Sequence, residues 1–304
     1  MRIFATLFHS SVSKSIFTTI ALLAVFTFAA STAQAQSLGY EGPTGVFVTP
    51  LASVSASPAN GLGKPAVGYH FIAGGNGLGD YQTVSVTEGF AKRFEVGYTS
   101  EFHAGSYHLP LLTSANVQGF EIVHGKANLI TSKTFGAISV GAIYRFNDHN
   151  LFDGSAIGPN QYQTTSNADF YVVGTKVFTG IKKVPVLFNA GLRGTNASLW
   201  GLAGNAPGYS ARGFGALAFV FTLPNKGNLI VGSEAAQQPQ RIKDGSAAIL
   251  DVPTSVVYAV RYVPSSKLKL NIDAGVLHAT SGHDGTDILA NAKDRVAFGI
   301  SYGF

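Results

Sequence analysis

The sequence contains no cysteine among its 304 residues, so the fold has no disulfide bonds as a source of stability. Charged residues are also scarce, at 12% of the chain. Arg2 and Lys14 are two of the 21 basic residues, and without them 19 basic residues stand against 16 acidic ones. This excess is too small to indicate a nucleic-acid-binding protein. Beyond residue 35 no run of 18 apolar residues occurs, so the sequence predicts no membrane-spanning helix.

Residues 1–35 have the pattern of a secretory signal peptide. Arg2 and Lys14 form a basic region without acidic residues, and an apolar run covers 16–30. Ala33-Gln34-Ala35 is a small-x-small cleavage site. A membrane anchor is the alternative, but the apolar run is shorter than the ~20 residues that a spanning helix needs. We therefore expect an exported chain that starts at Gln36.

The rest of the chain consists of short segments in which apolar residues recur at every second position. Gly, Asn, Asp and Pro separate these segments, and no sustained helical period occurs. This period of two is typical of strands that differ in polarity between their faces. The sequence predicts twelve strands, at 65–73, 80–88, 92–103, 115–130, 135–146, 168–178, 184–193, 211–222, 228–235, 252–262, 267–278 and 293–304.

The predicted connections alternate between short and long. Tight joins such as 89–91 and 131–134 are followed by long ones such as 104–114 and 147–167. Short turns at one end and long loops at the other are typical of outer-membrane barrels. We therefore predict an all-β fold over 65–304, a transmembrane antiparallel up-and-down β-barrel with both termini on the periplasmic side. A soluble β-sandwich is the alternative, and it does not account for this asymmetry.

The last strand has one face of apolar residues and one face of small residues, and it runs to the end of the chain. An apolar terminal strand is an aggregation hazard in water, so we expect it to close the barrel against 65–73. It resembles the C-terminal strand, ending in Phe, by which Gram-negative outer-membrane barrels are recognised for assembly. The resemblance implies an outer membrane of lipid and lipopolysaccharide as the surroundings. It also implies that the assembly machinery recognises the apolar face of this strand through Phe298, Ile300, Tyr302 and Phe304.

Charged residues should face the barrel interior, because Arg or Lys facing lipid at mid-depth costs roughly 2–4 kcal/mol. The predicted interior set has eight basic residues, four acidic residues and one histidine: Arg93, Glu95, Glu101, His103, Arg145, Lys176, Arg193, Arg212, Glu234, Arg261, Lys269, Asp273 and Arg295. In one interpretation these side chains pair and fill the interior. In the other they line a narrow pore that favours small polar or anionic solutes. The faces of 80–88 and 115–130 are mixed, since Glu121 has the opposite parity to His124 and Lys126.

Segment 36–64 is rich in Gly, Pro, Ser and Ala and differs from the predicted strands. It is expected to be a plug, an extra strand or a periplasmic tail. Its stretch Gly42-Pro43-Thr44-Gly45-Val46-Phe47-Val48-Thr49-Pro50-Leu51-Ala52 resembles the opening of YjbH-like outer-membrane proteins, which are associated with exopolysaccharide production. The resemblance implies a non-conducting barrel linked to polysaccharide export or surface interactions, as an alternative to a channel.

An outer-membrane lipid hydrolase is a further alternative, whereas no pattern in the sequence predicts a metal site or a cofactor. His278 and Ser281 lie close together near a strand end, and twelve-stranded outer-membrane phospholipases use a His and a Ser, but the flanking residues do not resemble that family's motif. The clusters 147–154 and 283–287 lack the spacing of a calcium-binding loop. Trp200, in a predicted long loop, is a candidate interfacial anchor. The sequence therefore predicts no enzyme and names no solute.

Overall fold

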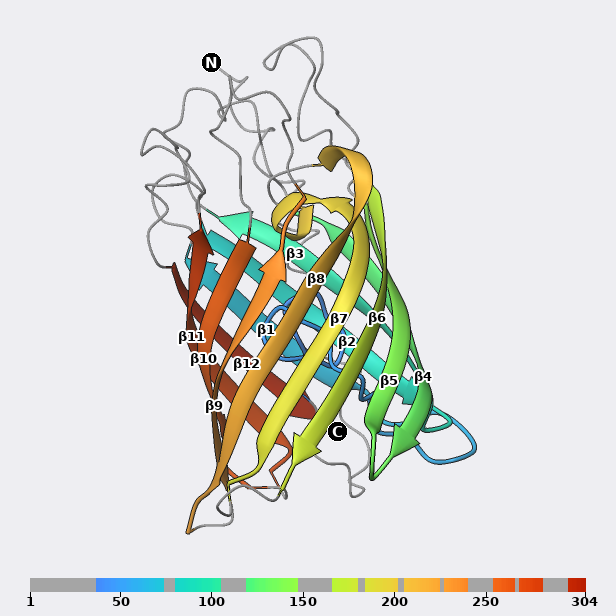
Figure 1. Cartoon of the computed structure of the whole chain (residues 1–304), viewed down its shortest axis with the longest axis vertical. Helices are drawn as coiled ribbons and strands as arrows, with labels where there is room; N and C mark the ends of the chain where they lie inside the picture. Colours follow the sequence, from blue (N-terminus) through green and yellow to red (C-terminus); the bar gives the residue numbers. More distant parts are fainter. Residues whose placement is uncertain are drawn as a thin grey trace, which may run out of the picture. The chain divides into compact units, whose positions relative to one another are not determined.

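Twelve antiparallel strands close into a barrel in the computed structural model, which confirms the predicted fold class (Figure 1). The structure describes residues 37–73, 80–104, 119–146, 166–179, 184–201, 205–224, 227–239, 254–265, 268–280 and 295–304. The strands are β1 (Ala66–Ala73), β2 (Asp80–Phe90), β3 (Phe94–Ala104), β4 (Glu121–Ser132), β5 (Gly136–Phe146), β6 (Asn167–Phe178), β7 (Val186–Ala197), β8 (Asn205–Thr222), β9 (Asn228–Gln237), β10 (Thr254–Val263), β11 (Leu270–Thr280) and β12 (Arg295–Gly303).

The last strand closes the ring, as its apolar face predicts. β12 pairs with β1 in an antiparallel ladder from Ala66 opposite Gly303 to Ile72 opposite Ala297. Every other strand pairs with its neighbours in sequence. Closure gives both terminal strands a partner, so neither leaves a free edge.

Two strands begin at positions that the sequence pattern misses. β4 begins at Glu121, six residues later than predicted, and β8 begins at Asn205, six residues earlier. The start of β8 contains Pro207 and Gly208, which read as loop residues. Its ladder with β9 begins only at Phe214, so this early part extends beyond that neighbour. A proline is tolerated there because no partner on that side needs its missing N–H.

Tight turns join strands at one end of the barrel. The β2–β3 turn holds Ala91 and Lys92 at φ of 51° and 57°, and Lys269 before β11 has a φ of 51°. These left-handed conformations reverse the chain within a few residues. Arg93 and Lys269 therefore lie in turns rather than in strands. The predicted long connections fall largely outside the described residues.

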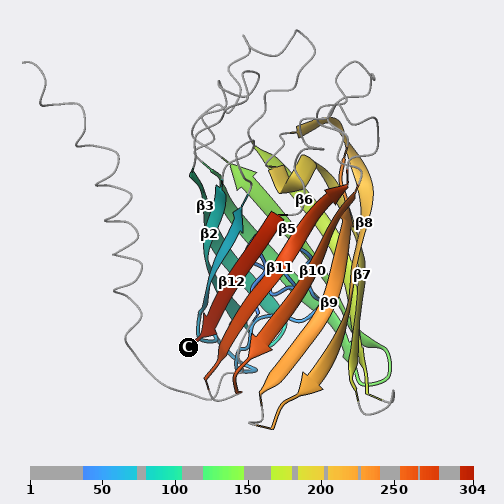
Figure 2. The same ribbon diagram turned by 90° about the vertical axis from the view of Figure 1, so that its left-hand side faces the viewer.

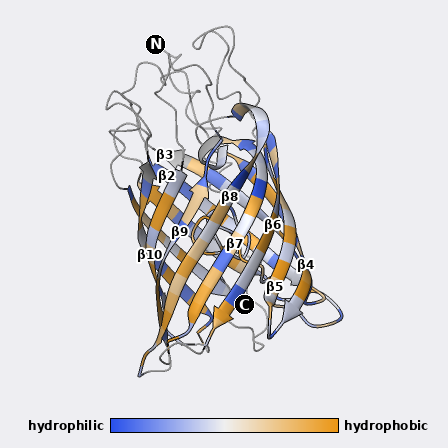
Figure 3. Cartoon of the chain, in the orientation of Figure 1, coloured by the Kyte–Doolittle hydropathy of each residue, from blue (hydrophilic) through white to orange (hydrophobic). Residues whose placement is uncertain are grey.

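The two faces of each strand differ in polarity, and Figure 3 shows apolar and polar bands alternating along the ribbons. Apolar side chains such as Val96, Val140, Val172 and Val260 are exposed on the outside. The mixed pattern of β4 resolves the same way, since His124, Lys126 and Asn128 are buried, while Val123 is exposed and Glu121 bonds to Tyr98 on the outer face. The barrel is thus apolar outside and polar inside.

Helix is almost absent from the parts of the chain that the structure describes. They contain the short 3-10 helix η1 (Ser198–Gly201), and no helix there is long and apolar enough to cross a membrane.

Candidate functional site

Residues 37–55, called the plug below, lie inside the barrel. Figures 1 and 2 show this segment in blue within the ring of strands in two perpendicular views. Tyr40, Phe47 and Ala52 are buried against wall residues that include Ile143 and Val257. Residues 56–64 then lead out past the β2–β3 turn, where Gly63 donates to the carbonyl of Gly89.

The carboxylate of Glu95 on β3 holds the plug through hydrogen bonds from backbone N–H groups and a hydroxyl group of the plug. It accepts hydrogen bonds from the Thr44 N–H at 2.9 Å, the Thr44 hydroxyl at 2.6 Å and the Ser55 N–H at 2.8 Å. Lys126 on β4 pairs with Glu95 at 2.9 Å and donates to the carbonyls of Thr44 and Leu51. The side chains of Glu95 and Lys126 are both fully buried. Buried charges need such compensation, so this contact depends on both partners.

Glu234 on β9 binds the tip of the plug. It accepts the backbone N–H groups of Phe47 and Val48 at 2.9 Å and of Thr49 at 2.8 Å, together with the Thr49 hydroxyl at 2.7 Å. Successive N–H groups that converge on one anion form a favourable concave site. The carboxylate therefore fixes both the position and the backbone conformation of the tip.

Glu41 of the plug enters a cluster of alternating charges on the wall. Arg145 on β5 binds Glu41 through Nε at 2.9 Å and Asp169 on β6 through Nη2 at 2.7 Å. Arg193 on β7 binds Glu41 at 3.0 Å and Asp169 at 3.4 Å. Two arginines and one aspartate on the wall leave one positive charge, which Glu41 neutralises. The plug thus completes the charge balance of this cluster.

Other polar contacts link the plug to further strands. Asn128 donates to the carbonyl of Ala52, Asn189 to that of Pro50, and Arg261 to that of Val46. The Tyr40 hydroxyl donates to Glu101 at 3.0 Å. Burial and the neighbouring Glu101 carboxylate raise the pKa of Tyr40 well above its usual range, which keeps the phenol a neutral donor. These contacts spread around the wall, so the plug is held on several sides.

Most of the predicted interior residues lie where the alternation places them. Five of them, Glu95, Glu101, Arg145, Arg193 and Glu234, are buried inside the barrel, and Asp273 is buried in an ion pair with Arg261. Arg212 and Arg295 share the parity of interior neighbours on β8 and β12, and the side chain of His103 is outside the described residues.

Three predicted interior residues do not face the interior. Arg93 is exposed in the β2–β3 turn, because β3 begins one residue later. Lys269 lies in the turn before β11. Lys176 has the outward parity of β6, where its ammonium donates to the carbonyl of Thr134 and lies 4.8 Å from the centre of the Phe178 ring. A lysine near a strand end can reach the polar boundary from the outer face.

Sequence analysis missed two charged residues that matter most to the cluster. Asp169 was within a predicted strand and shares its inward parity with Tyr171 and Val173, so its position could have been found. Glu41 had no strand pattern to reveal it. With both included, Arg145 and Arg193 of the predicted set have carboxylate partners in Glu41 and Asp169.

The remaining candidates have no common site. Trp200 is buried at 3% exposure in η1, so it is not an interfacial anchor. His278 is exposed on the outer face of β11, whereas Ser281 and the clusters at 147–154 and 283–287 lie outside the described residues. Phe298 and Tyr302 are exposed on the outer face of β12, Ile300 is partly exposed beside them, and Phe304 follows the strand.

Comparison with known proteins gives one family and several distant structures. Residues 35–271 match a family described as "Protein of unknown function (DUF3034)". No curated protein sequence matches the chain. A solved structure of the COG4313 outer membrane channel from Pseudomonas putida F1 is 13% identical, with a TM-score of 0.42 over 82% of this chain and 97% of that one.

Two further solved structures are more distant. The beta domain of the Bordetella autotransporter BrkA is 13% identical, with a TM-score of 0.37 over 81% of this chain and 100% of that one. Wzi from Escherichia coli, an outer membrane protein involved in group 1 capsule assembly, is 9% identical, with a TM-score of 0.27 over 74% of this chain and 52% of that one. None of the three is a YjbH-like protein, so that resemblance stays a prediction.

Proposed function

The chain belongs to the DUF3034 family of proteins of unknown function, and we propose that it is an outer-membrane channel for small polar or anionic solutes that its own plug keeps closed. The observation that carries this proposal is the mode of plug attachment. Buried carboxylates and arginines on the wall hold a short irregular segment across a polar interior.

The outer surface supports a membrane location. Its rows of exposed Val, Phe, Leu and Tyr would be a liability in water but suit lipid, and the strands of the closed ring pair with one another, as a lipid-facing surface requires. We extend the proposal to the partners of this surface, which are membrane lipid, lipopolysaccharide and the assembly machinery that reads β12.

The chemistry of the plug contacts supports a gate. A permanent filling needs only apolar packing, whereas buried ion pairs add little net stability and mainly specify one position. The wall groups that bind the plug are also groups that water can solvate once the plug has moved. The density of these contacts equally favours the second candidate, a non-conducting envelope barrel with a permanently filled interior.

If the outer face lies in a membrane, the loss of stability caused by a charged residue there should depend on its depth in the lipid. Val172 is at the middle of β6, and Phe178 is on the same outer face at its end. Val172→Arg should lower the free energy of unfolding in lipid vesicles by roughly 2–4 kcal/mol and Phe178→Arg by about 1 kcal/mol or less. Urea titration of both variants measures this difference. Equal costs at the two positions would contradict a lipid-facing surface.

A reversible tether tests the gate directly. A Cβ built on Gly68 of β1 lies 3.3 Å from the Cβ of Leu38 in the plug, close to the spacing in disulfides. Because the chain has no cysteine, Leu38→Cys with Gly68→Cys creates a unique pair. We expect the oxidised protein to show no channel openings in planar bilayers, and reduction to restore the openings of the unmodified chain.

The two single-cysteine variants are the controls for the tether and should behave the same with and without reductant. Openings of the oxidised double variant at the frequency of the unmodified chain would show that plug movement is not the gate. An unmodified chain that never opens would favour the non-conducting barrel.

A further inference from the structure

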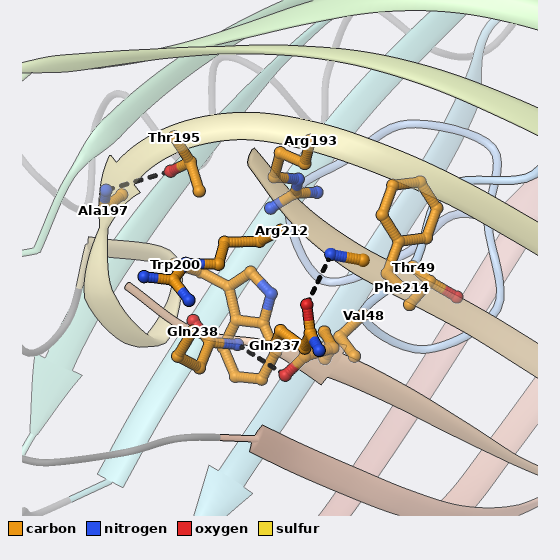
Figure 4. Close-up of a pocket in the computed structure, with 12 residues that line it drawn as sticks. Val48, Thr49, Arg193, Thr195, Ala197, Trp200, Arg212, Phe214, Gln237 and Gln238 are labelled. Carbon is orange, nitrogen blue, oxygen red and sulfur yellow. Dashed lines mark hydrogen bonds between the residues drawn. The ribbon is translucent and has the colours of Figure 1, made fainter. Parts of the chain in front are cut away.

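Two arginines face each other across neighbouring strands beside the plug. Arg193 on β7 and Arg212 on β8 are direct partners in the ladder. Both line a pocket that also includes Trp200, Gln237 and Thr49 of the plug, and Figure 4 shows these side chains around it. Like charges directly opposite each other are destabilising in a sheet. Such a pair needs an anion nearby.

The carboxylates near the pocket do not fully compensate the positive charge of the two arginines. Arg193 pairs with Glu41 and Asp169. Arg212 donates through Nε to the Ser210 hydroxyl at 2.9 Å, and within the described ranges no carboxylate lies within ion-pairing distance of it. The buried Nε of Arg193 also finds no hydrogen-bond acceptor in these ranges. The pocket therefore has surplus donors and surplus positive charge.

We propose that Arg193 and Arg212 bind the carboxylate of a small organic anion, and that this anion competes with Glu41 for Arg193. The planar guanidinium group matches a carboxylate in geometry and charge. Glu41 already presents a carboxylate to Arg145 and Arg193, so the protein contains its own example of the complex. With the plug in place the pocket has a free volume of about 10 Å³, roughly the space of one water molecule, so the anion fits only when the plug tip at Val48 and Thr49 moves aside.

This inference rests on the proposed function for its consequence, because an anion that displaces Glu41 would weaken the hold on the plug and open the channel to its own solute. The wall cluster keeps its charge balance in the exchange. One carboxylate leaves Arg193 and another replaces it. The inference thus assigns a solute class and a means of regulation to the same pocket.

Trp200 makes the site measurable in the full-length chain. It is the one tryptophan of the sequence, and it lines the pocket. We expect glucuronate, titrated at constant ionic strength into the detergent-folded protein, to give a saturable change in tryptophan fluorescence. Glucose, which lacks the carboxylate, should give none. Equal responses to the two sugars, or an equally tight response to inorganic phosphate, would overturn the carboxylate site.

Variants separate this site from a general effect of charge. Arg212→Gln should raise the Kd for glucuronate by about tenfold or more, because a charge-assisted hydrogen bond is lost. The Kd of Arg212→Lys should lie between those of the unmodified chain and Arg212→Gln. Arg93→Gln, an exposed position in the β2–β3 turn, is the matched control and should not change the Kd. An Arg212→Gln variant that folds as a heat-modifiable barrel and binds glucuronate normally would contradict the proposal.

Because Glu41 competes with the anion, its substitution should change the Kd in the opposite direction to Arg212→Gln. Glu41→Gln removes the internal competitor and should lower the Kd for glucuronate by about tenfold. An unchanged or higher Kd would refute the competition. The binding measurement needs no conductance, so the two proposals fail separately. Binding without any channel current contradicts the channel and leaves the site intact, whereas current without binding contradicts the site.

Discussion

A chain that lacks residues 37–64 should form a steadily open channel. We expect its mean current in planar bilayers to exceed that of the full-length chain by about tenfold or more, because a twelve-stranded ring is wider than the eight-stranded barrels that side chains alone can fill. The deletion removes the buried side chains of Tyr40 and Phe47 and leaves Glu95, Glu234 and Arg145 free for water to solvate. A polar wall stays hydrated, so the emptied interior should conduct.

The open channel should also have a slight preference for anions. With the plug gone, the described wall carries six basic groups, Lys126, Arg145, Arg193, Arg212, Arg261 and Arg295, and five acidic groups, Glu95, Glu101, Asp169, Glu234 and Asp273. The reversal potential in a salt gradient measures this preference. Clear cation selectivity would contradict the charge argument.

The control for this deletion is barrel formation itself. An unheated sample should migrate as a compact species on a denaturing gel and shift on heating, as the full-length chain should. A deletion that folds by this test but conducts no more than the full-length chain would contradict the plug as a gate and favour a non-conducting envelope barrel.

Lys126→Met should lower the free energy of unfolding by about 3–5 kcal/mol, because it leaves the buried Glu95 carboxylate without its cation. The Lys126 contacts to the carbonyls of Thr44 and Leu51 are lost with it, so the plug is loosened as well. Urea titration in lipid vesicles at neutral pH measures the change.

A second variant separates the ion pair from general damage to the interior. Lys126→Met combined with Glu95→Gln leaves no unpaired charge and should recover most of the lost stability, since a neutral amide oxygen still accepts bonds from the plug. Lys176→Met, on the outer face, should change the unfolding free energy by about 0.5 kcal/mol or less. A double variant no more stable than Lys126→Met would show that the pair is not the source of the effect.

The sequence was sufficient for the barrel because alternation is local. The alternation of apolar and polar residues within each strand identifies its apolar face. In β12 the apolar residues, which include Val296 and Phe298, predicted that this strand closes the barrel. The wrong predictions of interior residues lie at turns and strand ends, where alternation no longer determines the direction of a side chain. Arg93 follows two residues with left-handed backbone, and Lys176 lies near a strand end from which a long side chain reaches the boundary.

The site was less accessible to sequence analysis because its contacts are not local. Glu234 binds plug residues that lie 185 to 187 positions earlier in the chain, and Glu41 meets Arg193 across 152 positions. The sequence could identify the wall groups as interior residues. It could not show that the charge they lack is supplied by a segment without any strand pattern.

The plug and the wall that binds it are parts of one chain, joined to β1 by residues 56–65. A link of this length keeps a detached segment at an effective concentration of roughly millimolar near its binding groups. In the proposed gate each closing contact can therefore be individually weak, and the barrel would shut again after every opening without help from a second protein. A solute that holds it open must reach a comparable concentration at the mouth, so the flow through the barrel would follow the supply outside the cell.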